Sequence, residues 1–252
     1  TMEMDFKKYH EYLPKLIAIL AVLFIIFIGY QWFADDETPA EEVGVLGKTN
    51  EFIEKVAAAA RERNAEILET RKWLADQMRN DAPSDADKQR ILALAEKYKL
   101  KPDDHELPVM VWHLLQRVDV VPVSLVVAQA ANESAWGKSR FAREGNNLFG
   151  IWCYTEGCGI VPKLRKDEAK HEVRRYDSFK DSVVDYMKNI NRHRAYQKLR
   201  EIRAAERAAG RQLSGHRLAA GLGKYSEIGD DYIKRIRAII DGRKLTLLDT
   251  VD

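Results

Sequence analysis

One long uncharged segment near the N-terminus constrains this chain more than any other feature. The 19 residues from 16 to 34 carry no charge and are rich in Leu, Ile, Val and Phe. A helix of that length spans roughly 28 Å at about 1.5 Å per residue, close to the hydrocarbon thickness of about 30 Å. Tyr30 and Trp32 are near its C-terminal end, where aromatic rings are common among lipid head groups. We therefore predict a transmembrane helix over residues 16–34.

The residues on either side of this segment predict its orientation. A cleaved signal peptide is the closest alternative, but its apolar region usually has about 7–15 residues and ends in small side chains. Cleavage after Ala34 would instead place Trp32 at a small-residue position. Lysines precede the segment, whereas acidic residues follow it with no Lys or Arg before Lys48. The positive-inside rule therefore predicts that residues 1–15 are cytoplasmic and that the chain after residue 35 lies outside the cytoplasm.

The chain after the predicted anchor divides into a linker and a helical region. Residues 35–48 contain Pro, Gly and acidic side chains without an apolar period, which predicts a short linker. Residues 49–107 predict a helical extension, because apolar residues recur at helical spacing from 50 to 78. Ser84 or Asp85 is then placed to cap a second helix.

The overall charge excludes one class of partner. A formal net charge of +2, from 41 basic and 39 acidic residues, is too balanced for a surface built to hold nucleic acid. Residues 163–217 nonetheless carry 16 Lys and Arg against 8 Asp and Glu. This local excess is typical of solvated helix faces, and it also suits attraction to anionic wall polymers or to the outer face of the membrane.

One predicted helix carries a carboxyl group in a mostly apolar setting. It runs from Pro122 to about Trp136 and is apolar nearly all round, which is typical of a buried helix. Glu133 is near its C-terminal end, where loss of water and the negative pole of the helix dipole both favour the protonated carboxyl. Such a group can donate a proton, and the turn at Gly137 would let a cleft open beside it. The alternative is a structural carboxylate held in a salt bridge.

The segment after this helix combines amides with aromatic residues. Asn146 and Asn147 precede Phe149 and Trp152. Amides bind hydroxyl and acetamido groups, and an aromatic ring covers the apolar face of a sugar, so the composition suits a glycan groove. The same composition also occurs in an ordinary turn into a core strand. Residues 157–176 then predict a small β-hairpin around a polar turn.

These segments together resemble a known enzyme family. The run QAANESAWGKS from Gln129, followed by NNLFG from Asn146, is similar to the signature of glycoside hydrolase family seventy-three. Members of that family are endo-β-N-acetylglucosaminidases of bacterial peptidoglycan with a lysozyme-like helical fold. LLQRVD from Leu114 and WCYTEGCG from Trp152 resemble its Bax-type bacterial branch. The resemblance covers about residues 49–241.

The resemblance implies a fold and an activity. The fold is mainly α, a lysozyme-like helical domain with a small β-hairpin lobe over residues 108–245, preceded by one N-terminal transmembrane helix. The activity is hydrolysis of the β-1,4 bond after N-acetylglucosamine in peptidoglycan, by a protein held in the bacterial inner membrane with its catalytic domain in the periplasm. The alternatives are a lytic transglycosylase on the same glycan and a non-catalytic wall-binding or scaffold protein.

The resemblance also implies roles for individual residues. Glu133 corresponds to the family's general acid, which agrees with the helix-end argument. The family's tyrosine corresponds to Tyr225. The residues expected to contact sugars are Trp136, Asn146, Asn147, Phe149, Trp152 and Tyr154.

A second carboxylate is harder to assign. Glycosidases usually need one, and its distance from the acid, about 5–5.5 Å or about 6.5–9.5 Å, decides between retention and inversion. The predicted hairpin lobe offers Glu156, Asp167, Glu168 and Glu172, of which we favour Glu168. The N-acetyl group of the substrate is the alternative to a carboxylate.

The two cysteines predict a covalent loop. Cys153 and Cys158 are separated by four residues. Outside the cytoplasm, the default for such a pair is a disulfide that closes the loop. A zinc site needs four ligands, and no pair of histidines is spaced to complete one. We therefore expect a disulfide and neither a metal nor another cofactor.

Overall fold

The computed structural model describes residues 40–101, 106–165, 168–225 and 229–250. The chain forms two compact units, residues 1–49 and 50–252, and of the first the structure describes only the helical residues 40–49. The predicted transmembrane helix over residues 16–34 lies outside the described residues. Among the helices that are described, none is both long and apolar enough to cross a bilayer.

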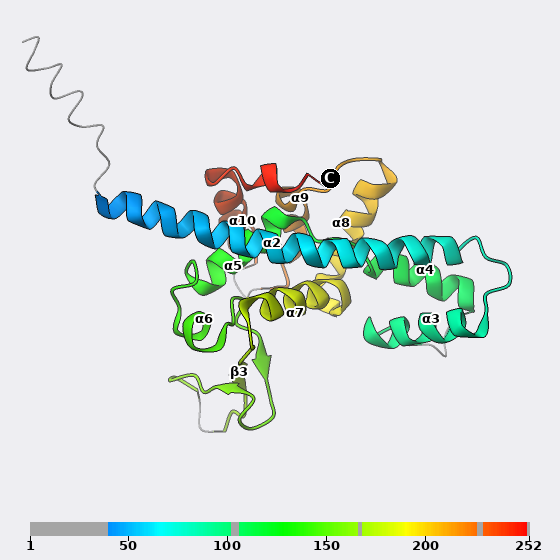
Figure 1. Cartoon of the computed structure of the whole chain (residues 1–252), viewed down its shortest axis with the longest axis horizontal. Helices are drawn as coiled ribbons and strands as arrows, with labels where there is room; N and C mark the ends of the chain where they lie inside the picture. Colours follow the sequence, from blue (N-terminus) through cyan, green and yellow to red (C-terminus); the bar gives the residue numbers. More distant parts are fainter. Residues whose placement is uncertain (1–39, 102–105, 166–167, 226–228, 251–252) are drawn as a thin grey trace, which may run out of the picture. The chain divides into compact units, whose positions relative to one another are not determined.

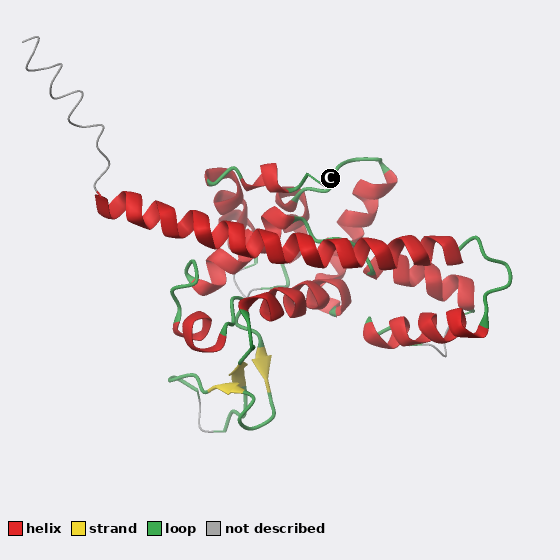
Figure 2. Ribbon diagram, viewed as in Figure 1, coloured by secondary structure: helices red, strands yellow, loops and turns green. Residues whose placement is uncertain are grey.

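Helices dominate the described part of the chain, which confirms the predicted mainly helical fold (Figures 1 and 2). The α-helices are α2 (Ala40–Gln77), α3 (Asp85–Lys97), α4 (Leu107–Arg117), α5 (Val123–Ser134), α6 (Arg140–Gly145), α7 (Phe179–Arg192), α8 (Gln197–Ala208), α9 (Gly215–Leu218) and α10 (Asp230–Gly242). Short 3-10 helices are η2 (Arg194–Tyr196), η3 (Ala219–Leu222) and η4 (Leu245–Leu248).

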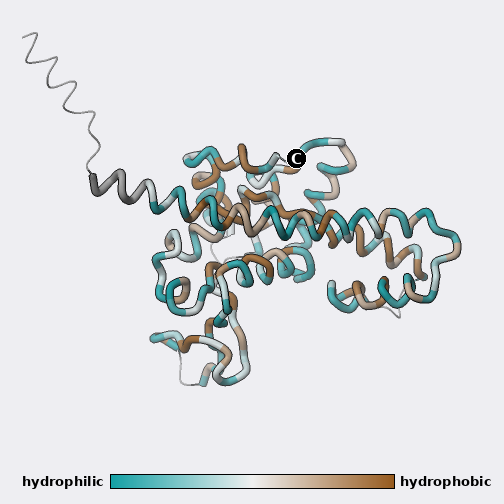
Figure 3. Tube along the Cα trace, in the orientation of Figure 1, coloured by the Kyte–Doolittle hydropathy of each residue, from teal (hydrophilic) through white to brown (hydrophobic). Residues whose placement is uncertain are grey.

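The first described helix begins earlier than expected. Helix α2 starts at Ala40, so the linker predicted over residues 35–48 is wrong for residues 40–48. Ala and Glu are strong helix formers, and they outweigh the cost of about 1 kcal/mol for each glycine in this stretch. Apolar and polar residues alternate along α2 (Figure 3), and Val56, Ile67 and Leu74 are buried in the core. The predicted helix over residues 50–78 is thus confirmed.

The small sheet contains one strand more than the sequence predicted. Strands β2 (Gly159–Ile160) and β3 (Glu172–Arg174) pair antiparallel, as the predicted hairpin requires. Strand β1 (Trp152–Cys153) also pairs antiparallel with β3, so the order is β1-β3-β2. A two-residue strand has too little alternation to be recognised from sequence. The close approach of β2 to β3 requires a glycine, because a Cβ at Gly159 would lie 2.1 Å from the Val173 carbonyl oxygen.

Helix α5 is the centre of the core. Ten of its 12 residues are buried, including the polar Ser124 and Gln129. The apolar sequence of this segment predicted such burial, because a helix that is apolar all round needs partners on every side. Helices α9 and α10 and η4 pack against it. The two residues of α5 that are not fully buried are Asn132 and Glu133, at its C-terminal end.

A buried ion-pair network fixes the loop that leads into α5. Asp119 is 3% exposed and accepts hydrogen bonds from Nε and Nη2 of Arg207, at 3.0 and 2.7 Å. Arg203, which is 1% exposed, and Arg71 of α2 each lie 3.7 Å from the same carboxylate. Burial opposes ionisation of Asp119, but Arg203, Arg207 and Arg71 outweigh it and lower its pKa. The network therefore ties α2 and α8 to the start of the core helix.

A second carboxylate holds the N-terminal end of α5 from the far end of the chain. The Asp249 side chain accepts hydrogen bonds from the Ser124 backbone N–H at 2.8 Å and from the Ser124 hydroxyl at 2.6 Å. It also accepts one from the Gly215 N–H at 3.0 Å. The N-terminal end of α5 is thus fixed by contacts that are distant in the sequence.

Candidate active site

An unusual backbone turn ends α5 directly after Glu133. Ala135, Trp136 and Gly137 all have positive φ values, of 50°, 59° and 78°. Positive φ is uncommon for residues other than glycine and must be stabilised by the surrounding contacts. Ser134 supplies them, because its hydroxyl donates to the Ala130 carbonyl at 2.6 Å and accepts from the Gly137 N–H at 2.8 Å. The chain therefore turns away sharply and leaves Glu133 at the end of the helix.

The Glu133 carboxylate is partly buried and bound by two neutral donors. Its Oε1 accepts a hydrogen bond from Nδ2 of Asn132 at 3.0 Å and another from the hydroxyl of Tyr232 at 2.7 Å. Among the described residues, no Lys or Arg pairs with it and no hydrogen bond reaches Oε2. The alternative interpretation of Glu133 as a salt-bridged structural carboxylate is therefore wrong for the part of the chain that is described.

A buried chain of hydrogen bonds supports the Glu133 carboxylate. Gln129 lies one helical turn before Glu133, and its Nε2 donates to the Tyr232 hydroxyl at 2.9 Å. The Tyr186 hydroxyl donates to Gln129 Oε1. Burial, and then the proximity of Tyr225 and Glu133, raises the pKa of Tyr232. Tyr232 therefore keeps its proton and acts as a fixed donor to Glu133.

The tyrosine expected from sequence lies beside the one that makes the contact. The Tyr225 ring is 4.9 Å from that of Tyr232 and 5.9 Å from that of Tyr196, measured between centroids. Burial, and then Glu133 and Tyr196, raises the pKa of Tyr225. Tyr232 was missed because it has the helical spacing of a core residue in α10. Its hydroxyl was the available signal, since a buried tyrosine usually requires a hydrogen-bond partner.

The two amides predicted to bind sugars are used by the protein backbone. Asn147 is 1% exposed, and its Nδ2 donates to the carbonyls of Ile151 and Arg174, both at 2.9 Å. Its Oδ1 accepts from the N–H groups of Phe149 and Ile151. No hydrogen-bonding group of Asn147 is left for a substrate, so its expected sugar contact is wrong.

Asn146 also has a structural role. It ends α6 in the left-handed region, with φ of 51°, and its Nδ2 donates to the carbonyls of Tyr176 and Asp177. Asparagine tolerates this backbone conformation better than most residues, which explains its position. The amide pair therefore fastens α6 to the chain after β3.

Two of the aromatic residues predicted to contact sugars pack against other side chains, Phe149 in the core and Trp136 at a partly buried position. Phe149 is 4% exposed and stacks on Tyr186, with centroids 4.0 Å apart. The Trp136 ring meets the Phe52 ring of α2 edge to face, with centroids 5.9 Å apart. The guanidinium of Arg243 lies over the Trp136 ring, 5.3 Å from its centroid. Phe149 belongs to the core, which excludes the expected sugar contact, and the neighbours of Trp136 give it a packing role.

The other two aromatic residues are accessible. Trp152 of β1 is 51% exposed, and Tyr154 is 72% exposed. The indole of Trp152 stacks on the imidazole of His171, with centroids 4.0 Å apart and planes within 16°. This stacking holds the ring in one orientation, so Trp152 presents a fixed flat surface of the kind on which a sugar ring packs.

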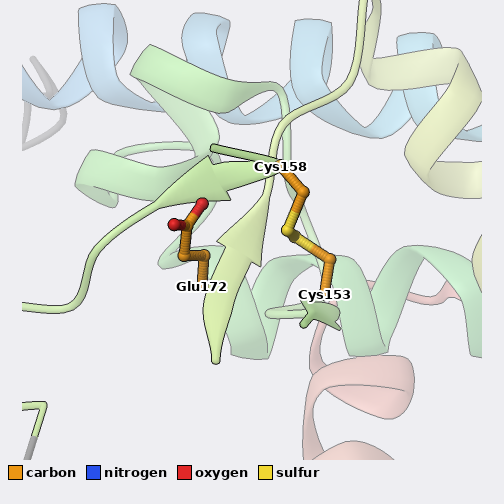
Figure 4. A group of neighbouring side chains, drawn as sticks. All are labelled: Cys153, Cys158 and Glu172. Carbon is orange, nitrogen blue, oxygen red and sulfur yellow. A yellow bond between two sulfur atoms is a disulfide. The ribbon is translucent and has the colours of Figure 1, made fainter. Parts of the chain in front are cut away.

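A disulfide and a buried carboxylate fix the loop between β1 and β2. Cys153 and Cys158 form the predicted disulfide (Figure 4). Beside it, Glu172 of β3 accepts hydrogen bonds from the N–H groups of Gly157 at 3.0 Å and Gly159 at 2.7 Å. These two backbone donors lower the pKa of Glu172. Glu172 is therefore a structural carboxylate of the loop that carries Tyr154.

Comparison with known proteins decides the family. Residues 110–245 match the family described as "Mannosyl-glycoprotein endo-beta-N-acetylglucosaminidase", named Glucosaminidase, which is more than half of the chain. The chain belongs to this glucosaminidase family. A glycoside hydrolase domain thus occupies the region that holds α5, the sheet and α10, and the resemblance seen in the sequence is confirmed.

Individual relatives agree with this assignment. The chain is 34% identical over 181 residues to "Protein bax" of Escherichia coli, which is 72% of this chain and 64% of that protein. It is 28% identical over 151 residues to "Exo-glucosaminidase LytG" of Bacillus subtilis, or 55% of this chain and 50% of that protein. A third relative, "Peptidoglycan hydrolase FlgJ" of Escherichia coli, is 31% identical over 101 residues, 35% of this chain and 32% of its own. The chain therefore spans between a third and two thirds of the relatives that it matches.

The remaining acidic candidates of the glucosaminidase domain differ in their surroundings. Glu156 and Glu168 are exposed, and Asp167 lies outside the described residues. Glu172 is occupied by the backbone of the disulfide loop. Of the four candidates for a second carboxylate, Glu156 and Glu168 are thus the described ones with access to solvent.

One group of side chains has the composition of a metal site without the chemistry of one. Within the described residues, the sulfur atoms of Cys153 and Cys158 and a carboxylate oxygen of Glu172 lie within 4.8 Å of one another (Figure 4). The two sulfur atoms are bonded to each other, so neither is a thiolate that can bind a metal. This group is a structural part of the glucosaminidase domain.

Proposed function

We propose that Glu133 is the general acid of a peptidoglycan-cleaving endo-β-N-acetylglucosaminidase. The observation that carries the proposal is the asymmetric binding of its carboxyl group, in which Asn132 and Tyr232 both donate to Oε1. The proton of the acid form then belongs on Oε2, which no described residue engages. From there it can pass to the oxygen of the glycosidic bond, the role of the acid in glycoside hydrolysis.

The relatives support the choice of substrate. One relative is named a peptidoglycan hydrolase and another an exo-glucosaminidase, and together the two names support cleavage of peptidoglycan glycan. The exposed faces of Trp152 and Tyr154 suit a polysaccharide, because aromatic rings pack on the apolar faces of sugars. An internal cut shortens a glycan quickly, whereas a terminal cut releases small fragments. The size of the early products therefore separates endo from exo action.

We extend the proposal to the second catalytic group. The Glu172 carboxylate is occupied by hydrogen bonds from the disulfide loop. We therefore favour Glu168 as the second carboxylate, with Glu156 as the alternative. If none of Glu168→Gln, Glu156→Gln and Asp167→Asn lowers turnover, the N-acetyl group of the substrate takes this role. Anhydro-muramyl products would instead identify a lytic transglycosylase, which requires one glutamate.

We also propose that residues 16–34 anchor the protein in the inner membrane with residues 50–252 in the periplasm. The disulfide between Cys153 and Cys158 supports this, because disulfides persist in oxidising compartments and are rare in the cytosol. Protease added to intact spheroplasts should digest the glucosaminidase domain. Protection of that domain from the protease would overturn the proposed orientation.

The proposed acid is tested by Glu133→Gln. We expect turnover of isolated wall glycan to fall by about 10²–10⁴, because the amide cannot donate the proton in the transition state. Glu144→Gln, at an exposed position of α6, is the matched control and should leave turnover unchanged. Mass spectrometry should find reducing N-acetylglucosamine ends with the wild type. Full turnover by Glu133→Gln would show that Glu133 is not the general acid. No cleavage by the wild type would favour a wall-binding protein.

A further inference from the structure

A large basic cavity lies apart from Glu133. Its volume is about 880 Å³, and it is enclosed by α4, the end of α7, η2 and α8 together with the turn after α3. Its basic and aromatic lining residues are Lys99, Trp112, His113, Arg117, Arg192, His193, Arg194 and Arg200. Glu133 and the tyrosines that surround it do not line this cavity.

Among the described residues, no carboxylate pairs with the cations that line this cavity. Five Lys and Arg side chains line it, and the described residues place no Asp or Glu within ion-pair distance of any of them. Glu201 is the one acidic lining residue among those described, and its carboxylate pairs with Lys198 at 3.5 Å and accepts from Gln197 at 3.1 Å. Elsewhere in the molecule, by contrast, three arginines surround the single carboxylate of Asp119.

The backbone holds two of these arginines in place. Arg117 donates to the carbonyls of Tyr98 at 2.8 Å and Arg192 at 3.0 Å. Arg200 donates to the carbonyls of Ile190 and His193, both at 2.9 Å. The buried Nε of Arg192 has no hydrogen-bond partner. These backbone bonds hold Arg117 and Arg200 in place at the lining of the cavity.

The ionisation of two lining residues reflects burial first and the neighbouring cations second. Burial, and then Arg117 and Arg203, lowers the pKa of Arg200 to about 10. Burial, and then Lys99 and Arg194, lowers the pKa of His193. In both cases the neighbouring cations act in the same direction as burial.

A second hollow adjoins this cavity. It has a volume of about 370 Å³ and shares Arg194, Gln197 and Glu201 with the larger cavity. It extends to Lys224, the residue before Tyr225. The two hollows together therefore border α8 and η2 on the side where the chain leads to Tyr225.

We propose that the basic cavity binds the carboxylate groups of peptidoglycan peptide stems, as a second subsite beside the sugar-cutting site. The inference rests on the proposed function, which supplies a glycan that carries peptides with several free carboxylates. Arginine forks bind carboxylates in a bidentate manner, and the half-exposed Trp112 offers an apolar surface to the aliphatic parts of a peptide. An open hollow of this volume has room for a few amino-acid residues, and it is concave where a lipid surface would need a flat or convex basic face.

The test measures binding of the free wall tetrapeptide by titration calorimetry. Lys99→Gln combined with Arg194→Gln removes two exposed lining charges whose side chains bond to no described residue. We expect this double variant to bind the tetrapeptide about tenfold more weakly, since two exposed ion pairs with its carboxylates are lost. The control combines Lys72→Gln with Arg79→Gln on α2, which removes the same charge away from the cavity. A tetrapeptide with amidated carboxylates should bind weakly to the wild type.

The same variants separate the inference from the function on which it rests. On intact wall, Lys99→Gln with Arg194→Gln should raise KM, whereas on glycan stripped of its peptides it should behave as the wild type. Glu133→Gln should keep full tetrapeptide affinity. If the wild type cuts no glycan but binds the tetrapeptide through these cations, only the proposed function fails.

Three outcomes would overturn the inference. The first is no binding of the tetrapeptide by the wild type, and the second is equal binding by the lining variant and the control. The third is that inorganic phosphate, or vesicles of phosphatidylglycerol, bind through Lys99 and Arg194 while the tetrapeptide does not. Thermal unfolding of both double variants should match that of the wild type, because all four side chains are exposed.

Discussion

At the scale of single residues, the candidate acid depends on one phenol. Tyr232 connects Glu133 to Gln129 and through it to Tyr186, all within hydrogen-bond distance. Because its pKa is raised by burial, Tyr232 remains a donor over the whole physiological range. A neutral donor orients the carboxylate without removing the negative charge that must accept a proton again after each turnover.

Tyr232→Phe tests this role, because it keeps the ring and removes the hydroxyl. We expect kcat on isolated wall glycan to fall by about 10- to 100-fold, since a hydrogen bond to a charged group contributes about 1.5–3 kcal/mol. Tyr225→Phe removes a hydroxyl from the neighbouring ring and should lower kcat less. An equal loss in the two variants, or a loss in Tyr225→Phe alone, would show that Tyr232 does not position the acid.

At the scale of elements, the sheet lobe is held by few contacts. Its strands have two or three residues, and a strand pair of that length is not stable by itself. The disulfide between Cys153 and Cys158 and the two bonds of Glu172 supply what the strands lack. The exposed rings of Trp152 and Tyr154 therefore depend on these covalent and polar contacts for their positions.

Loosening the sheet lobe should affect substrate binding more than the chemical step. In Cys153→Ser with Cys158→Ser, we expect KM for wall glycan to rise several-fold with a smaller fall in kcat, because the lobe carries the exposed rings and the candidate second carboxylates but not Glu133. Glu172→Gln should act in the same direction. The two carboxylate oxygens of Glu172 each accept from one glycine N–H, and glutamine replaces one of these oxygens with an NH2 group that cannot accept. A fall in kcat at constant KM would contradict this division of roles.

At the scale of the whole molecule, one buried carboxylate holds two helices that are distant in the sequence. Asp119 joins Arg71 of α2 to Arg203 and Arg207 of α8. Arg203 also donates to backbone carbonyls of the same loop, at Asp119 and Val120. Removal of the carboxylate would leave Arg203 buried without its counter-charge, which is the costly way to break a buried pair.

Asp119→Asn should therefore lower the free energy of unfolding by roughly 3–5 kcal/mol at pH 7. The pKa of Asp119 is lower in the folded chain than the ordinary value of about 3.9, so its contribution is present above that value. It is lost as the pH falls through the lowered pKa. Urea unfolding at pH 7 and in acid should show the variant converging on the wild type at low pH. As a control, Asp231→Asn removes an exposed i,i+3 ion pair with Lys234. It should change the free energy of unfolding by less than about 0.5 kcal/mol.

Sequence reasoning succeeded where a local pattern decides the outcome. The burial of α5 and the place of Glu133 at its end follow from apolar residues on every face and from the residues that stop the helix. The disulfide follows from the spacing and the expected compartment. Patterns of this kind need no knowledge of distant partners.

Other residues could not be assigned because their roles depend on contacts from far along the chain. Asn147 has the chemistry of a sugar ligand, yet its amide is used by Ile151 and Arg174. Glu172 looks like a catalytic carboxylate until β3 brings it to the glycine N–H groups. Tyr232 reaches Glu133 across 99 positions of sequence. The basic cavity likewise joins segments that are more than 90 residues apart.

The bond between Asp249 and Ser124 has a practical consequence for anyone who trims this protein. A fragment excised at the limits of the family match, residues 110–245, would lose the aspartate that pins the first turn of α5. It would also lose Val56, Ile67 and Leu74, whose side chains complete the core. Such a piece would expose apolar surface and aggregate, so recombinant work should begin upstream of residue 50 and continue past residue 249.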